Sequence, residues 1–157
     1  MAEHDAAMDE QQMLISTFYL GEAAFGLDTA HIQEVVRVGD ITPVHHAPEF
    51  VVGIMNLRGR IATVIDLGVK LDLDRAPTGA DNRIFIVDWQ GEQIGLLVDR
   101  VADAGSVDRA DLKPPPENVR GVQGRLFQGV FPVDGRLIAL LDTAAVLDIE
   151  GARDKRG

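Results

Sequence analysis

Few residues of this chain have the types and spacing that catalysis requires. The only serines are Ser16 and Ser106, and neither lies in the G-x-S-x-G turn of a nucleophilic serine. The phosphate-binding G-x-x-x-x-G-K-[ST], the zinc-binding H-E-x-x-H and the dinucleotide-binding G-x-G-x-x-G sequences are all absent. Because the chain has no cysteine, it has no thiolate nucleophile and no cysteine-bound metal. The sequence therefore favours a protein that is not an enzyme and needs no cofactor.

A metal site built from histidine and carboxylate groups is the remaining chemical possibility. Its members would be His31, His45 and His46 with Glu34 or Glu49. The adjacent residues His45 and His46 would point to opposite faces of a strand, which disfavours their binding one ion. We therefore expect no metal site and assign no role to the histidine pair.

The charge of the chain excludes one class of partner. The formal net charge is −10 with a pI near 4.7, and only three lysines occur. Nucleic acid and anionic membrane surfaces both require clustered basic residues. No run of 18 apolar residues is present, and Met1–Gln12 carries acidic residues but no lysine or arginine. We expect no nucleic acid partner, no direct membrane contact, no signal peptide and a cytoplasmic location.

Short apolar runs separated by glycines make up most of the chain, and they are typical of β-strands. Asp28 is expected to cap a short helix that carries Ile32, Val35 and Val36 on one face. Asp66 is expected to cap a second short helix. With few helices, this spacing predicts an all-β barrel or sandwich. The expected strands cover residues 13–20, 23–27, 53–57, 60–65, 83–89 and 94–98.

Two segments of the chain repeat each other without a gap. Gly53–Leu71 (GIMNLRGRIATVIDLGVKL) matches Gly129–Leu147 (GVFPVDGRLIALLDTAAVL), 76 positions later. A weaker echo joins the GE and GL pairs at 21–27 to those at 91–96. We therefore expect two similar β units, at about 13–71 and 83–149, joined by a polar linker at 72–82. Residues 1–12 are expected to form a disordered acidic tail and residues 151–157 a second tail.

The repeat separates residues that the fold needs from residues that it does not. Gly59 and Gly135 occur at the same turn and predict a positive φ there. The capping aspartates and the arginine after each turn are shared too. In contrast, Arg58 in the first copy stands where the second has Asp134. Arg58 is therefore a candidate binding residue with ordinary backbone geometry, the alternative being a solvated turn arginine.

Several motifs resemble the CheW-like domain family. They are AFGLDTAHIQEVV and APEFVVGIMNLRGRIATVIDLGVKL, in which NLRG and the following VIDL are the most specific parts. GLLVDRVADAGSV, a Lys-Pro-Pro stretch and the second repeat segment agree with the later part of that domain. The resemblance covers residues 13–149 and implies one domain at 13–150. It implies an all-β fold with a few short helices, in which two five-stranded SH3-like β-barrels share a hydrophobic core.

The same resemblance implies a function and two binding surfaces. It implies a scaffold that couples the regulatory domain of a chemotaxis histidine kinase to the cytoplasmic tips of methyl-accepting chemoreceptors, in signalling arrays at the inner face of the membrane. The receptor helices would lie in a groove with an apolar floor and one fixed guanidinium group. The implied receptor-side residues are Arg58, Glu34, Ile32, Gly53, Asn56, Ile84, Val101 and Ala104. The kinase-facing edge has no motif, and we assign it to Gly39, Asp40, Ile41 and Val44.

Each of these assignments has a structural alternative. Ile32, Ile84 and Val101 could instead be core residues. Glu34 could be the solvated face of its helix, and Gly53 could be a strand-start glycine, since the repeat shares it.

The sequence departs from the family at a few positions, and other functions stay open. Thr63 stands where proline is common, and Ala104 stands where a larger aliphatic residue is common. A CheW-like adaptor of a twitching or other non-flagellar kinase pathway is the first alternative. A small-ligand-binding β-barrel, a protein of a different class, is the second.

Overall fold

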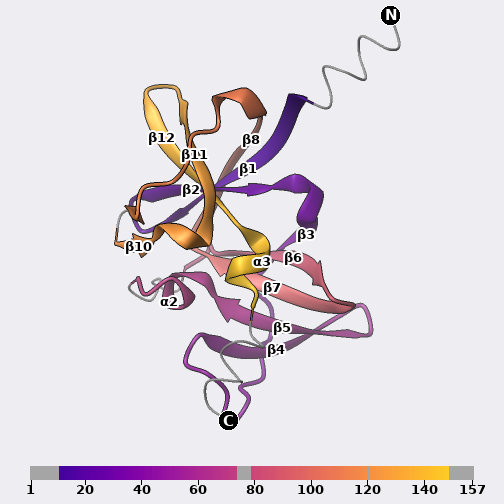
Figure 1. Ribbon diagram of the computed structural model, residues 1–157. Helices are drawn as coiled ribbons and strands as arrows, with labels where there is room; N and C mark the ends of the chain where they lie inside the picture. The colour runs from indigo at the N-terminus through magenta and orange to yellow at the C-terminus, as the bar shows by residue number, and fades with distance from the viewer. Residues whose placement is uncertain (1–10, 74–78, 120, 149–157) are drawn as a thin grey trace, which may run out of the picture.

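Two five-stranded β-sheets, one above the other in Figure 1, make up most of the protein. The computed structural model describes residues 11–73, 79–119 and 121–148. The strands are β1 (Gln12–Leu20), β2 (Ala23–Asp28), β3 (Ile32–Arg37), β4 (Val51–Leu57), β5 (Arg60–Asp66), β6 (Arg83–Trp89), β7 (Glu92–Val98), β8 (Arg100–Asp108), β9 (Asn118–Val119), β10 (Val122–Gln123), β11 (Phe127–Val133) and β12 (Arg136–Leu141). The helices are η1 (Thr29–His31), α2 (Leu67–Lys70), η2 (Arg109–Asp111), η3 (Gly124–Leu126) and α3 (Thr143–Val146).

The two sheets have the same internal arrangement. One has the order β11-β12-β2-β1-β8, and the other, read from its opposite end, has the order β4-β5-β7-β6-β3. In each sheet two antiparallel hairpins meet through one parallel pair, β12 with β2 and β5 with β7. We call the two units the β1 barrel and the β6 barrel. Each combines strands from both sequence segments, so the sheets do not follow the expected units 13–71 and 83–149.

Three clusters of buried side chains show how the barrels share a core. One cluster fills each barrel, and a larger one, which we call the shared core, takes residues from both sheets. In the shared core the ring centroids of Phe18 of β1 and Phe85 of β6 lie 5.5 Å apart at an edge-on angle. Phe25 stacks on Phe127 at 5.8 Å. The contact between Phe18 and Phe85 therefore joins the two sheets, and the expected all-β fold of two five-stranded barrels is confirmed.

The repeated turns and caps adopt the geometry that the sequence predicts. Gly59 and Gly135 have φ angles of 84° and 76° in equivalent hairpin turns. The carboxylate of Asp66 accepts from the backbone N–H of Val69 at 3.2 Å, which caps α2. Asp142 caps α3 at the same distance. The residues common to both repeats thus serve the architecture.

The prediction of a helix after Asp28 is wrong beyond the first turn. Asp28 does accept from the N–H of Ala30, but the 3₁₀ turn η1 ends at His31. Ile32–Arg37 forms β3 instead, because its backbone groups pair with β6 and its β-branched residues suit a strand. A bulge between Ile32 and Glu34 interrupts the register.

The expected tails and part of the expected linker lie outside the described residues. This holds for residues 1–10, 74–78 and 149–157. Gln12, which we placed in the tail, already belongs to β1. The assignment of residues 13–150 to one domain stays a prediction.

Candidate functional site

Arg58 and Glu34 form an ion pair between the β4–β5 turn and the edge strand β3 of the β6 barrel. Glu34 lies on β3, Arg58 lies in the turn between β4 and β5, and the guanidinium contacts the carboxylate. The side chains are 68% and 29% exposed, so the contact is worth little in stability. An exposed guanidinium held by one carboxylate keeps most of its N–H donors for a partner.

The turn that presents Arg58 has special backbone geometry, contrary to our expectation. Arg58 has a φ of 52° and is followed by Gly59 at 84°, the pattern of a two-residue hairpin turn. The side chain of Asn56 accepts from the N–H of Gly59 at 2.8 Å. Asn56 is therefore a turn-forming residue, and its amide oxygen is already used within the chain.

Ile32 and Val101 are half-buried residues that pack against the shared core from different barrels. Ile32 lies on β3 of the β6 barrel, and Val101 lies on β8 of the β1 barrel. Packing against the shared core therefore accounts for only the buried part of each side chain, and the rest is exposed to solvent. Ile32 and Glu34 share strand β3, so this edge of the β6 barrel carries both a half-buried apolar residue and the ion pair.

Two of the implied receptor-side residues are interior residues. Ile84 is fully buried in the cluster that fills the β6 barrel, so it offers no surface to a partner and its assignment is corrected to core packing. Gly53 is buried, and a Cβ there would lie 2.2 Å from the carbonyl oxygen of Thr42. The equivalent Gly129 approaches the carbonyl oxygen of Lys113 in the same way. The close approach at Gly53 is thus internal and is repeated in both barrels.

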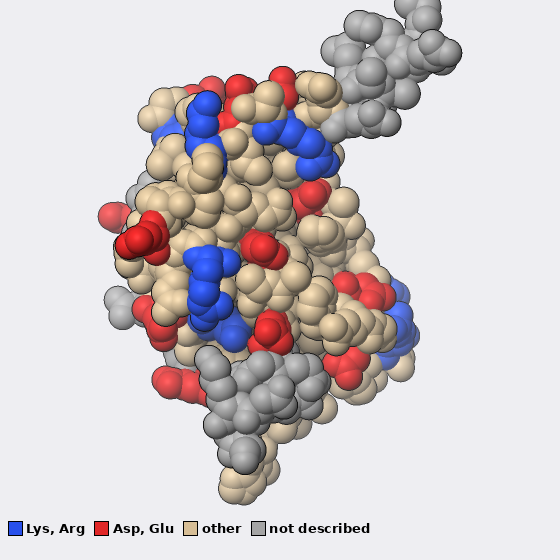
Figure 2. Space-filling view, viewed as in Figure 1, with Lys and Arg blue, Asp and Glu red and all other residues tan. Residues whose placement is uncertain are grey.

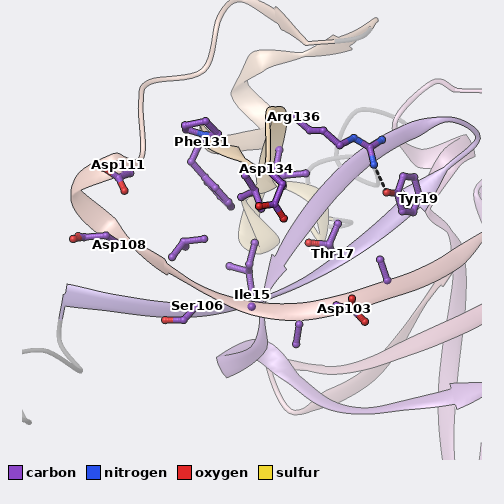
Figure 3. Close-up of a pocket in the computed structure, with 17 residues that line it drawn as sticks. Ile15, Thr17, Tyr19, Asp103, Ser106, Asp108, Asp111, Phe131, Asp134 and Arg136 are labelled. Carbon is purple, nitrogen blue, oxygen red and sulfur yellow. Dashed lines mark hydrogen bonds between the residues drawn. The ribbon is translucent and has the colours of Figure 1, made fainter.

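Ala104 lies apart from the ion pair, in a cavity of about 490 Å³ at the mouth of the β1 barrel. Figure 3 shows this cavity between β1, β8, β11 and β12, with Ile15 and Phe131 among its apolar lining. Ala104 is exposed there on β8. The structure brings Arg58, Glu34 and Asn56 together on one barrel and leaves Ala104 on the other.

The proposed kinase-facing residues lie in the connection between β3 and β4. Gly39, Asp40 and Val44 are exposed, and Val44 keeps 45% of its surface accessible. Ile41 is half-buried and packs against the β6 barrel. Thr42 pairs with Ile54 of β4 and so fixes this connection to the barrel edge.

Among the described residues, the three histidines do not belong to a metal-binding cluster. His31 has its Nδ1 3.0 Å from the hydroxyl of Thr143, which ties η1 to α3. His45 and His46 lie in a turn, and not on a strand as we assumed, with a φ of 63° at His46. Within residues 11–73, 79–119 and 121–148, no group of three or more histidine or carboxylate side chains is arranged to hold a metal ion.

The surface view agrees with the composition. On the face in Figure 2 acidic side chains are scattered among basic ones, without one continuous basic patch. None of the helices in the described parts of the chain is both long and apolar enough to cross a membrane.

Sequence reasoning missed a cluster of Tyr19, Arg100 and Arg136, which lies beside the cavity that Ala104 lines. Arg136 had been explained only as a shared repeat residue. The signal that could have found the cluster is Tyr19 itself, because it is the only tyrosine of the chain.

Several known proteins are similar to this chain in sequence. The family profile of the CheW-like domain matches residues 15–151. The chemotaxis protein CheW of Thermotoga maritima is 32% identical over 146 residues, covering 90% of this chain and 91% of that protein. Protein FrzA of Myxococcus xanthus is 29% identical over 111 residues, covering 71% and 69%.

A solved structure has a similar fold. The scaffolding protein TtCheW from Thermoanaerobacter tengcongensis superposes with a TM-score of 0.81 at 33% identity, over 88% of this chain and 90% of that one. Because the family profile spans most of the chain and the fold agrees with that of a solved relative, the chain belongs to the CheW-like domain family.

Proposed function

We propose that this chain is a non-enzymatic scaffold that couples the regulatory domain of a chemotaxis histidine kinase to the cytoplasmic tips of chemoreceptors. It would act at the inner face of the membrane through receptor arrays. Membership of the CheW-like family and similarity to proteins named as chemotaxis or scaffolding proteins support this role.

The observation that carries the receptor half is the exposed guanidinium of Arg58, held by Glu34 of β3. A helical receptor tip presents an apolar stripe and a polar edge. Ile32 and Val101 would contact the stripe, and Arg58 would bind a polar group on the edge. Ile84 and Gly53 are left out of this surface because they are buried. Asn56 contributes by holding the turn.

The kinase half is assigned to the connection between β3 and β4. Asp40 and Val44 are exposed there, and Val38 at its start is 42% exposed. An exposed apolar pair beside an acidic residue, fixed to a barrel edge by Thr42, fits a small protein-protein contact. This surface lies in the β3–β4 connection and Arg58 lies in the β4–β5 turn, so the two proposed contacts use different residues and can be tested separately.

Binding of the two partners to the full chain tests the proposal. Titration calorimetry with a receptor tip fragment should show that Arg58→Gln weakens binding by about 2 kcal/mol, the usual effect of removing a central arginine. Glutamine is preferred to glutamate here, because a carboxylate beside Glu34 would add repulsion. Affinity for the kinase regulatory domain should stay unchanged.

Asp134→Asn is the matched control, since Asp134 occupies the equivalent turn of the other barrel with a φ of 49°. It should leave both affinities unchanged. Equal receptor binding by wild type and Arg58→Gln would reject the receptor surface. Failure of the wild type to bind either partner would reject the function itself.

An adaptor role in another kinase pathway, such as twitching, is the second candidate. The similarity to FrzA, a relative not named as a CheW protein, favours keeping it. Titration with kinase regulatory domains from both kinds of pathway separates the two, because the cognate domain should bind more tightly.

A further inference from the structure

Two arginines converge on the single tyrosine of the chain at the mouth of the β1 barrel. Tyr19 of β1 is 9% exposed, and its hydroxyl accepts from the Nη1 of Arg136 at 2.6 Å. The guanidinium carbon of Arg100 lies 3.8 Å from the centroid of the same ring, and that of Arg136 lies 5.3 Å from it. Figure 3 shows Arg136 directed at Tyr19 on one side of the cavity.

The fold does not require this cluster, as the equivalent position of the other barrel shows. Tyr19 pairs with Ala24 between β1 and β2, and Asp88 pairs with Gln93 at the same place between β6 and β7. Asp88 holds the next turn there by accepting from the N–H of Gly91 at 3.2 Å. Arg60, the counterpart of Arg136, therefore has no tyrosine to contact. The arginine is thus shared by both barrels, whereas its contact with a tyrosine is specific to the β1 barrel and is free to serve binding.

The charge of the cluster is not balanced within the described part of the chain. Neither Arg100 nor Arg136 forms an ion pair with a described carboxylate, although the net charge is −10. The ring contact of Arg100 and the hydrogen bond of Arg136 hold both guanidinium groups against Tyr19 and lower the entropy lost on binding. Arg136 uses one N–H for the tyrosine hydroxyl, so its remaining donors and those of Arg100 can bind an anion.

The surroundings favour a carboxylate over a phosphate. Asp103 and Asp134 line the same cavity, so a doubly charged phosphate would meet more repulsion than a single carboxylate. The apolar lining, which includes Ile15 and Phe131, suits the hydrocarbon part of a side chain. Tyrosine and arginine together are typical of a protein-binding surface.

We propose that Tyr19, Arg100 and Arg136 form a docking site for an aspartate or glutamate side chain of a partner protein. The site lies on the β1 barrel, whereas Arg58 and Glu34 lie on the β6 barrel. It goes beyond the coupling function proposed above and does not depend on which receptor or kinase is bound.

A titration of the full chain tests the site, because ¹³C-labelled tyrosine gives signals from Tyr19 alone. The probes are the blocked peptide acetyl-Gly-Leu-Glu-Leu-Gly-amide, its Glu→Gln counterpart and inorganic phosphate. The Glu peptide should shift the Tyr19 ring signals and the arginine Nε signals saturably. It should bind about tenfold more tightly than the Gln peptide, as expected for a charge-assisted hydrogen bond.

Arg100→Gln and Arg136→Gln should each abolish this preference. Arg100 is exposed, so its removal tests the site without risk to the fold. Arg60→Gln is the matched control and should keep the preference. Equal binding of the two peptides, no saturable shift, or tighter binding of phosphate than of the Glu peptide would each overturn the proposal.

Discussion

Arg58 combines an unfavourable backbone conformation with a side chain that is both ion-paired and exposed. Its φ of 52° is a conformation that favours glycine or asparagine, so the chain accepts a small backbone cost at this turn. Its ion pair with Glu34 is mostly solvated and offsets little of that cost. An arginine kept at such a position fits a role in binding better than a role in stability.

The first prediction separates the two roles of the ion pair. Arg58→Glu places two carboxylates side by side and should lower the free energy of unfolding by no more than about 1 kcal/mol, since the site is largely exposed. The double variant Glu34→Arg/Arg58→Glu restores opposite charges and should recover that loss in a urea titration.

Receptor affinity should not recover in the double variant, because the partner would meet a carboxylate where it needs a guanidinium. Recovery of both properties would show that the pair acts only as a link between β3 and the β4–β5 turn.

The second prediction concerns Gly53. An added Cβ would lie 2.2 Å from the Thr42 carbonyl oxygen, so Gly53→Ala must move the β3–β4 connection. We expect thermal unfolding to show a loss of at least about 2 kcal/mol, as for other overpacked sites. Gly129→Ala should lose a similar amount, because its Cβ would lie 2.4 Å from the Lys113 carbonyl oxygen. Unchanged stability with lost receptor binding would restore the binding assignment of Gly53.

Residue roles could be predicted from the sequence where the repeat supplied a comparison. The turn glycines and capping aspartates are shared by both copies, and the structure gives them equivalent geometry. Ile84 was misassigned because β6 is buried on both faces, one in the β6 barrel and one in the shared core, and only the folded chain shows this. The Tyr19 cluster joins three distant positions, so only the folded chain brings them together.

At the scale of elements, β3 shows where periodicity fails. Ile32, Val35 and Val36 have helical spacing, but six residues are too few to distinguish a helix from a strand. The long-range pairing with β6 decides the outcome. The short helices after β5 and β12 were predictable, because an aspartate cap is a local signal.

The third prediction tests a cap. Asp142→Ala removes the acceptor for the N–H of Ala145 and should lower the free energy of unfolding by about 1 kcal/mol. Asp142→Asn keeps an acceptor at the same place and should lose much less. Chemical denaturation of both variants measures the difference. Equal losses would mean that the charge of Asp142, and not its cap bond, stabilises α3.

At the scale of the molecule, the repeat predicted two similar units but not how they combine. Each sheet joins a hairpin of one sequence segment to strands of the other through the parallel pairs β12 with β2 and β5 with β7. Parallel pairing has no local turn signal, because its strands are far apart in the chain. The exchange also places Phe18 and Phe85 in one shared core, which connects the barrels.

The last prediction follows from this exchange. If the sequence segments were independent barrels, a fragment of residues 1–76 would fold alone. Instead, that fragment holds β1 and β2 without β8, β11 and β12, and it holds β3, β4 and β5 without β6 and β7. Both sheets would then have open edges and much of the shared core would be exposed to water, so neither residues 1–76 nor residues 77–157 should unfold cooperatively when alone. Mixed at equal concentration, the two fragments should assemble one to one and recover the circular dichroism spectrum and the melting transition of the whole chain. A cooperative melting transition in either isolated fragment would contradict the prediction, because it would mean that half of the strands suffice for a stable barrel.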